Sequence, residues 1–146
     1  MNMMHWIGLA FGLLAPALMG VASDVKPARE AVRISFSEDD FRIGPAHKTK
    51  EIALAPGDKL TVALGSNPST GYSWGEQATN SNPAVLKQVK HQRMNPKQPM
   101  PGAGGSESWT FEALQPGAAI LNFSYGRPWE GGEKGAWTVK VTAKVQ

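Results

Sequence analysis

The sequence contains no cysteine, and this absence excludes several kinds of chemistry. Without a thiol the chain has no disulfide, no cysteine nucleophile, no iron–sulfur ligand and no lipid-modified cysteine. A chain without disulfides depends on its hydrophobic core for stability, and a domain of about 120 residues can bury a core of sufficient size. The length of 146 residues fits one domain rather than two.

Charged side chains are missing from the first 22 residues, MNMMHWIGLAFGLLAPALMGVA. This apolar stretch contains Pro16 and ends in Gly20-Val21-Ala22, small residues of the kind that signal peptidase prefers. We therefore predict a signal peptide over residues 1–22, an N-terminal extension over 23–30, and an exported protein that is periplasmic or secreted. An uncleaved anchor helix is the alternative, but a bilayer span needs roughly 20 uninterrupted apolar residues.

Basic clusters and metal-ligand sets are also missing. The net charge of +3 is spread thinly, and no basic run has interleaved aromatics, so we expect no nucleic-acid partner. Beyond the predicted signal peptide only His47 and His91 remain, and neither has a second His or Cys at metal-binding spacing. We expect no metal, no cofactor and, after removal of the signal peptide, no membrane association.

The sequence shows no arrangement of residues that would support catalysis. Ser69 and Thr70 lie in no Gly-x-Ser-x-Gly elbow and have no evident base. The acidic residues at Glu38-Asp39-Asp40 and at Glu130 and Glu133 lie in polar, turn-like surroundings, which would not raise a carboxyl pKa as a glycosidase general acid requires. We therefore expect that the protein is not an enzyme.

Apolar and polar residues alternate with period two in several segments of the remaining chain. The clearest is 137–145, and the same pattern occurs at 32–36, 59–64, 108–114 and 118–125. Turns are expected at 55–58 and 115–117, and no segment sustains a helical period over three turns. These features predict an all-β, immunoglobulin-like antiparallel β-sandwich without a disulfide over residues 31–146. A small closed barrel is the structural alternative.

Two segments show no strand pattern. Residues 90–105, KHQRMNPKQPMPGAGG, contain three prolines and three glycines and are predicted to form a long loop, which is either functional or a mobile crossover. The segment FRIGPAHKTKE, residues 41–51, is interpreted as an exposed connection.

Three connections stand out: NPSTGY at 67–72, GAGG at 102–105 and RPW at 127–129. In a sandwich of this strand order all three connections emerge at the same end. Pro68 fixes φ and Gly71 is free to adopt positive φ, so the first loop would form a thin, stiff tip. Taken alone, its composition is also typical of an ordinary turn.

Together the three loops resemble those of the chagasin family of cysteine-peptidase inhibitors. That family is marked by an Asn-Pro-Thr-Thr-Gly-Tyr loop, a Gly-x-Gly-Gly loop and an Arg-Pro-Trp loop in this order, and the one departure here is Ser69 in place of Thr. The resemblance covers roughly residues 31–146. It implies a monomeric, reversible, non-covalent inhibitor that occludes the cleft of papain-like cysteine peptidases in a one-to-one complex. The peptidase-binding residues that it implies are Asn67, Pro68, Ser69, Thr70, Gly71, Tyr72, Gly102, Ala103, Gly104, Gly105, Arg127, Pro128 and Trp129.

The resemblance also implies the order of the loops in the cleft. Thr70 would lie nearest to the peptidase's catalytic Cys–His pair, with loop 127–129 on one flank and loop 102–105 on the other. Tyr72 and Trp74 share one face of a strand, so we also expect both to pack against the core.

The residues leave two other functions open. A secreted β-sandwich could bind a glycan or another ligand with the same loop end, and Trp129 would then stack on a sugar ring. A structural envelope protein would use none of these loops.

Overall fold

The computed structural model describes residues 31–96 and 104–146. The predicted signal peptide (1–22), the extension (23–30) and the loop residues Gly102 and Ala103 lie outside the described residues.

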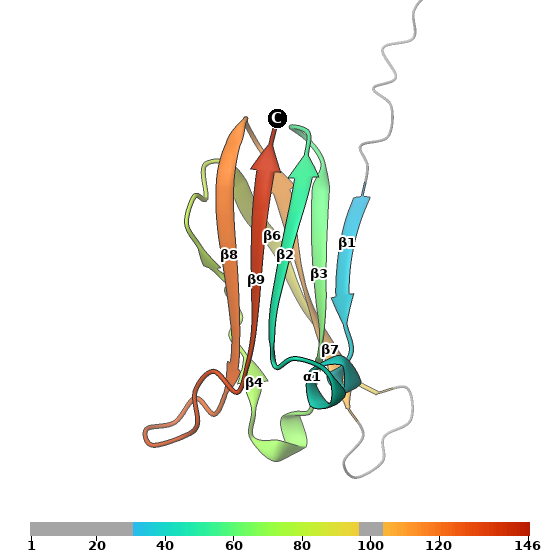
Figure 1. The fold of residues 1–146 in the computed structure, drawn as a ribbon, viewed down its shortest axis with the longest axis vertical. Helices are drawn as coiled ribbons and strands as arrows, with labels where there is room; N and C mark the ends of the chain where they lie inside the picture. Colours follow the sequence, from blue (N-terminus) through green and yellow to red (C-terminus); the bar gives the residue numbers. More distant parts are fainter. Residues whose placement is uncertain (1–30, 97–103) are drawn as a thin grey trace, which may run out of the picture.

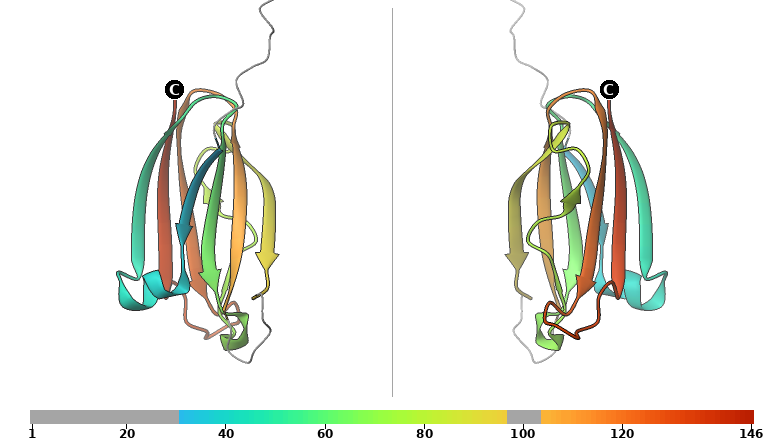
Figure 2. Two further views of the ribbon diagram at one scale, coloured as in Figure 1. Left: turned by 90° about the vertical axis from the view of Figure 1, so that its right-hand side faces the viewer. Right: turned by 90° about the vertical axis from the view of Figure 1, so that its left-hand side faces the viewer.

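The described chain forms two β-sheets packed face to face (Figure 1). One sheet has the order β1-β3-β7-β6 and consists of β1 (Ala31–Phe36), β3 (Lys59–Ser66), β7 (Gly105–Ala113) and β6 (Leu86–Met94). The other has the order β2-β9-β8-β4, with β5 paired to β8, and consists of β2 (His47–Leu54), β9 (Trp137–Val145), β8 (Gly117–Gly126), β4 (Ser73–Trp74) and β5 (Thr79–Asn80). Figure 2 shows the two layers from the side. The predicted immunoglobulin-like sandwich is confirmed.

The centre of each sheet is antiparallel, as expected, but two edge strands are not. β7 runs antiparallel to β3 and β6, and β8 runs antiparallel to β9. In contrast, β1 lies parallel to β3, and β2 lies parallel to β9. β1 and β2 follow each other in sequence but belong to different sheets, and the connection between them crosses from one layer to the other at the lower end of Figure 1.

Two strand boundaries differ from the sequence prediction. β6 continues to Met94, and Gly105 opens β7, so the long loop predicted for 90–105 is shorter than expected. The inward positions of β6 that precede this loop carry His91 and Arg93, which contact the buried carboxylate of Glu107 at 3.1 and 3.7 Å. Because these two positions are polar, the segment does not show the alternation of apolar and polar residues that predicts a strand.

The predicted connection over 41–51 is also wrong, because it contains part of a helix and most of β2. α1 (Glu38–Ile43) begins at the cap residue Ser37, whose hydroxyl accepts from the Asp40 N–H while the Asp40 carboxylate accepts from the Ser37 N–H. The hydrogen bond from the Ser37 N–H lowers the pKa of Asp40. The acidic run is therefore the first turn of a helix, and Phe41 on this helix is buried.

Aromatic side chains fill the core at the end where α1 lies. Trp74 is 1% exposed and lies 4.9 Å from the Tyr125 ring and 5.6 Å from the Phe41 ring, centroid to centroid. Its indole N–H donates to the Gly65 carbonyl at 3.0 Å. Tyr72 is only half-buried, but its ring stacks on Tyr125 at 5.5 Å, as expected for a residue on the core side of its strand.

Within the described ranges, no helix has the length and apolar composition needed to cross a bilayer. In the same part of the chain, no three His, Asp or Glu side chains gather as metal ligands would.

Candidate functional site

One end of the sandwich carries the predicted loops. The β3–β4 and β8–β9 connections both lie at the lower end of Figure 1, where the β3–β4 connection is between the β8–β9 connection and α1. β6 ends and β7 begins at this end too, because Gly105 pairs with Ser66, the last residue of β3. Ser66 and Gly105, which are 39 positions apart in the sequence, are therefore neighbours here.

The first loop is held by its own hydrogen bonds. Pro68–Thr70 form one turn of 3₁₀-helix, η1. The Thr70 N–H and hydroxyl both donate to the Asn67 carbonyl, at 3.2 and 2.6 Å, and the Ser69 hydroxyl donates to the Asn67 side-chain oxygen at 2.5 Å. Both hydroxyls are thus used within the loop, and their carbon atoms and the backbone form the exposed tip.

The core supports this loop through a buried phenol. The Tyr125 hydroxyl accepts from the Asn67 N–H at 2.9 Å, where β3 ends and the loop begins. Burial raises the pKa of Tyr125, although the hydrogen bond that its oxygen accepts from the Asn67 N–H opposes the shift. The phenol therefore stays neutral at physiological pH and holds the base of the loop in place.

The first and third loops touch at Gly71 and Trp129. Gly71 adopts φ +79°, a left-handed conformation that favours glycine. A β-carbon at Gly71 would lie only 2.5 Å from Cη2 of Trp129, so the indole rests where a side chain would otherwise be. Trp129 nevertheless remains 51% exposed. Gly71 therefore serves both the turn and the seating of Trp129.

Arg127 bridges the same two loops from the other side. The centre of its guanidinium lies 4.6 Å from the Tyr72 ring centroid and 5.7 Å from that of Trp129. One of its terminal nitrogens is 3.5 Å from the Thr70 carbonyl oxygen, while the buried Nε has no hydrogen-bond partner among the described residues. Arg127 therefore acts mainly as a flat cation that holds two aromatic rings in place.

Two residues that the sequence analysis did not assign to the site complete this arrangement. The Lys134 ammonium donates to the Trp129 carbonyl at 2.9 Å and also to the Arg127 carbonyl. The Tyr72 hydroxyl donates to the Glu133 carboxylate, and this hydrogen bond raises the pKa of Tyr72. Tyr72 and Glu133 are 61 positions apart, so no local pattern could have indicated the contact.

Gly104 and Gly105 of the second loop lie against neighbouring segments. A β-carbon on Gly105 would lie 2.5 Å from the Met94 carbonyl oxygen, and one on Gly104 would lie 2.5 Å from a carboxylate oxygen of Glu38 in α1. Both glycines thus permit close packing. Of the predicted binding residues, 67–72 and 127–129 form one connected group, whereas Gly104 lies beside α1 and Gly105 lies beside the end of β6.

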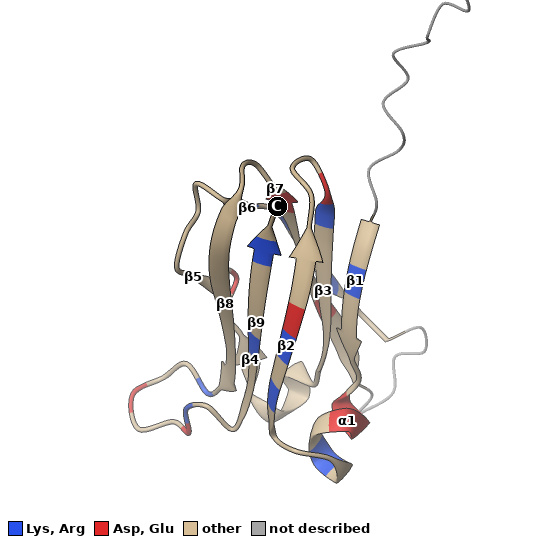
Figure 3. Cartoon of the chain, turned by 45° about the horizontal axis from the view of Figure 1, so that its top comes forward, with Lys and Arg blue, Asp and Glu red and all other residues tan. Residues whose placement is uncertain are grey.

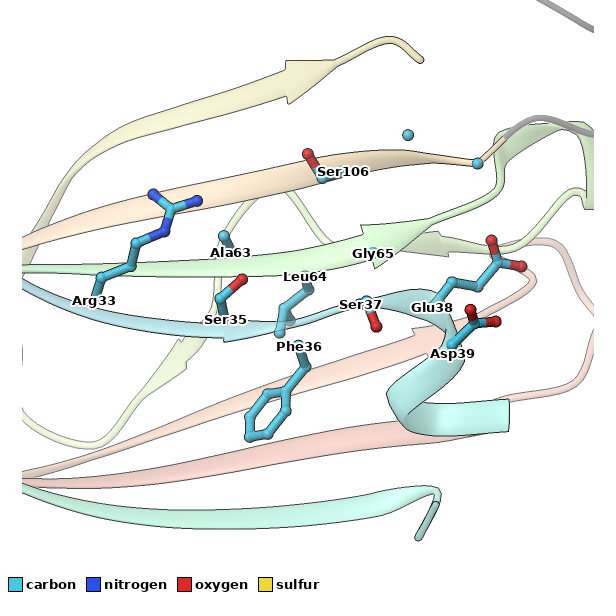
Figure 4. Close-up of a pocket in the computed structure, with 12 residues that line it drawn as sticks. Arg33, Ser35, Phe36, Ser37, Glu38, Asp39, Ala63, Leu64, Gly65 and Ser106 are labelled. Atoms are coloured by element: carbon cyan, nitrogen blue, oxygen red, sulfur yellow. The ribbon is translucent and has the colours of Figure 1, made fainter. Parts of the chain in front are cut away.

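A polar hollow of about 410 Å³ lies between the start of α1 and the ends of β1, β3 and β7 (Figure 4). The carboxylates of Glu38 and Asp39 lie at one end of it and Arg33 at the other. Its wall is formed by small residues such as Ala63, Gly65 and Ser106.

We expect Gly71→Ala to weaken any function that depends on the seating of Trp129. A left-handed conformation costs an L-residue roughly 1–2 kcal/mol, and here the new methyl group also displaces the indole. If Trp129 contacts the partner, this displacement of its indole should weaken binding about tenfold. Gly135→Ala is the matched control, because Gly135 also has positive φ (+65°) but its β-carbon would meet only ordinary contacts. Chemical denaturation should show similar losses of stability for both variants, and equal binding by the two would contradict the role of Gly71.

Most of the described domain matches a known protein family. The profile described as "Chagasin family peptidase inhibitor I42" matches residues 53–143. A protein named chagasin, from Trypanosoma cruzi, is 30% identical over 92 residues, which are 62% of this chain and 84% of that protein.

Solved structures share the fold at low sequence identity. The cysteine protease inhibitor EhICP2 from Entamoeba histolytica superposes with a TM-score of 0.62 at 18% identity, covering 80% of this chain and 98% of its own. PbICP-C, solved in complex with falcipain-2, superposes with a TM-score of 0.56 at 16% identity, covering 80% and 99%.

Proposed function

The chain belongs to the chagasin family of peptidase inhibitors, and we propose that it inhibits papain-like cysteine peptidases by reversible, non-covalent occlusion of their cleft. The observation that carries this proposal is the preassembled tip, in which Trp129 rests on Gly71 and Arg127 bridges Trp129 and Tyr72. A loop that is already ordered loses little conformational entropy on binding. The known cysteine protease inhibitor EhICP2 and the falcipain-2 complex of PbICP-C support this function through their common fold.

The geometry suggests how the tip would block a cleft. Pro68, Ser69 and Thr70 are all exposed at the narrow end of the sandwich. Because the Ser69 and Thr70 hydroxyls already donate within the loop, the tip can enter a cleft without leaving these donors unpaired. Trp129 adds a large, half-exposed apolar surface of the kind that dominates binding energy at interfaces. In this mechanism Thr70 lies nearest to the catalytic pair of the peptidase, and no bond of the inhibitor is cleaved.

We further propose that the protein acts outside the cytoplasm. This proposal rests on the predicted signal peptide over 1–22, whose apolar stretch and small-residue ending Gly20-Val21-Ala22 are typical of export. The target peptidase would then be periplasmic, or encountered after secretion.

Titration of papain tests the function directly. Purified protein lacking residues 1–22 is added to papain, and hydrolysis of a peptide substrate is followed. We expect stoichiometric loss of activity, recovery of activity on dilution, and inhibitor that mass spectrometry shows to be uncut. A protein shown to be folded by circular dichroism that leaves papain and a panel of related peptidases active at micromolar concentration would refute the proposal. Glycan binding by that protein would favour the ligand-binding alternative.

A further inference from the structure

The helix α1 lies outside the part of the chain that the family profile matches. The match covers residues 53–143, whereas α1 spans Glu38–Ile43. Even so, α1 is found at the end of the sandwich that carries the candidate site, beside η1 (Figures 1 and 2). The helix thus lies next to loops that the profile matches, although the profile match does not include the helix itself.

α1 is held firmly against the core. The Phe41 ring stacks on Trp137 at a centroid distance of 5.0 Å and an interplanar angle of 11°. The Lys48 ammonium donates to the Asp40 carbonyl at 2.9 Å, and the Ser37 cap fixes the first turn. The helix is therefore a rigid part of the surface, and its exposed residues have fixed positions relative to the loops.

α1 also adjoins the candidate site on two sides. Its Glu38 carboxylate lies where a β-carbon of Gly104 would be, so it packs closely on the second loop. Toward the first loop, a groove of about 470 Å³ separates α1 from η1. Glu38 and Arg42 line the groove on the helix side, and the remaining lining includes Thr70, Tyr72, Tyr125 and Trp137. The groove is therefore lined by three aromatic rings together with charged and polar side chains, and it opens next to the tip.

Three exposed apolar side chains lie on separate elements at this end of the molecule. They are three of the five large hydrophobic residues that are most exposed in the described ranges. Ile43 at the end of α1 is 86% exposed, Trp129 is 51% exposed, and Met94 at the end of β6 is 47% exposed. Ile43 is the one that lies on α1, and its side chain is the most exposed of the five.

We propose that α1 is a fourth contact element, which meets the peptidase beside its cleft. The groove between α1 and η1 receives an apolar side chain from the rim of the cleft, and Ile43 packs against the same rim. This inference rests on the proposed inhibitory function, since the partner is the same peptidase. Stable protein interfaces bury roughly 800 Å² on each partner, and a helix beside the tip widens the contact toward that size. The first turn of α1 is acidic and Arg42 follows it, so the helix carries charges of both signs next to Ile43 (Figure 3).

The first test replaces the most exposed side chain of α1. In Ile43→Glu, a charge would be buried against the peptidase, and we expect the inhibition constant for papain to rise about tenfold. Leu114→Glu is the matched control, because Leu114 is 46% exposed but follows β7 at the opposite end of the sandwich. Its inhibition constant should equal that of the unmodified chain. Equal constants for the Ile43 and Leu114 variants would overturn the proposal.

The second test fills the groove. Ala136 lines it and is partly exposed, so in Ala136→Trp the new indole should occupy the groove and raise the inhibition constant severalfold. An unchanged constant in the folded variant would show that the groove stays empty in the complex. If Ile43→Glu instead dissociates a dimer seen by sedimentation and leaves inhibition unchanged, the apolar surface serves a second copy of the chain and the proposal fails. Failure of the unmodified protein to inhibit would refute the inhibitory function itself, which is a different result from inhibition that α1 does not affect.

Discussion

Replacing Trp129 with alanine is expected to raise the inhibition constant for papain-like peptidases by about 10- to 1000-fold, the range of a strong interface residue. The indole is half-exposed, rests on Gly71 and contacts the Arg127 guanidinium. Its removal deletes a large apolar contact and also leaves the Arg127 guanidinium held only by the Tyr72 ring and the Thr70 carbonyl. Steady-state inhibition kinetics measure the change.

The same variant should keep its stability, because Trp129 contributes little to the core. Surface substitutions of this kind usually change the free energy of unfolding by less than about 0.5 kcal/mol. Thermal unfolding followed by circular dichroism is therefore the control. An unchanged inhibition constant in the folded Trp129 variant would show that the third loop does not enter the contact.

Trp74→Ala is expected to have the opposite effect, a large loss in the free energy of unfolding. Trp74 is 1% exposed, contacts Phe41, Trp109 and Tyr125, and donates a hydrogen bond to Gly65. Large-to-small substitution of a buried Trp typically costs about 3–5 kcal/mol, since a cavity remains after the transfer free energy is lost. Denaturant titration should show a loss of this size in the free energy of unfolding.

Trp129→Ala is the matched control for this experiment, because it removes the same side chain from the surface instead of from the core. A loss below about 1 kcal/mol in Trp74→Ala would contradict the packing described here, in which the Trp74 ring lies between the two sheets. Inhibition by the Trp74 variant should be measured at low denaturant and low temperature, where enough of it remains folded.

The strands that could be predicted from the sequence are those with one face in the core. β9 shows this most clearly, since Val139, Val141 and Ala143 are fully buried and the residues between them are not. β2 and β6 are edge strands, and much of each is exposed. Few side chains of such strands face the core, so few positions have to be apolar. Apolar and polar residues therefore do not alternate along them, and their bounds could not be predicted. α1 has only six residues, too few to show a helical period.

The candidate site was predictable only as far as its residues are contiguous. The segments 67–72 and 127–129 could be identified as loops because Pro and Gly mark turns. The contacts between them could not, because the stacking of Arg127 on Tyr72 and the hydrogen bonds made by Glu133 and Lys134 depend on how distant strands are paired. Nor does any local pattern show that the acidic run at Glu38 lies against Gly104.

The contact between Gly71 and Trp129 makes the shapes of two loops, whose contacting residues are 58 positions apart, depend on each other. A side chain at position 71 would occupy the space of the indole, and a smaller residue at 129 would leave that space open. Neither position can change freely while the other is kept, so lineages that alter one are expected to alter both. For the same reason, a chimera that takes only one of the two loops from a relative would join two loops that do not fit each other. Transfer of specificity between such proteins therefore calls for exchange of both loops together.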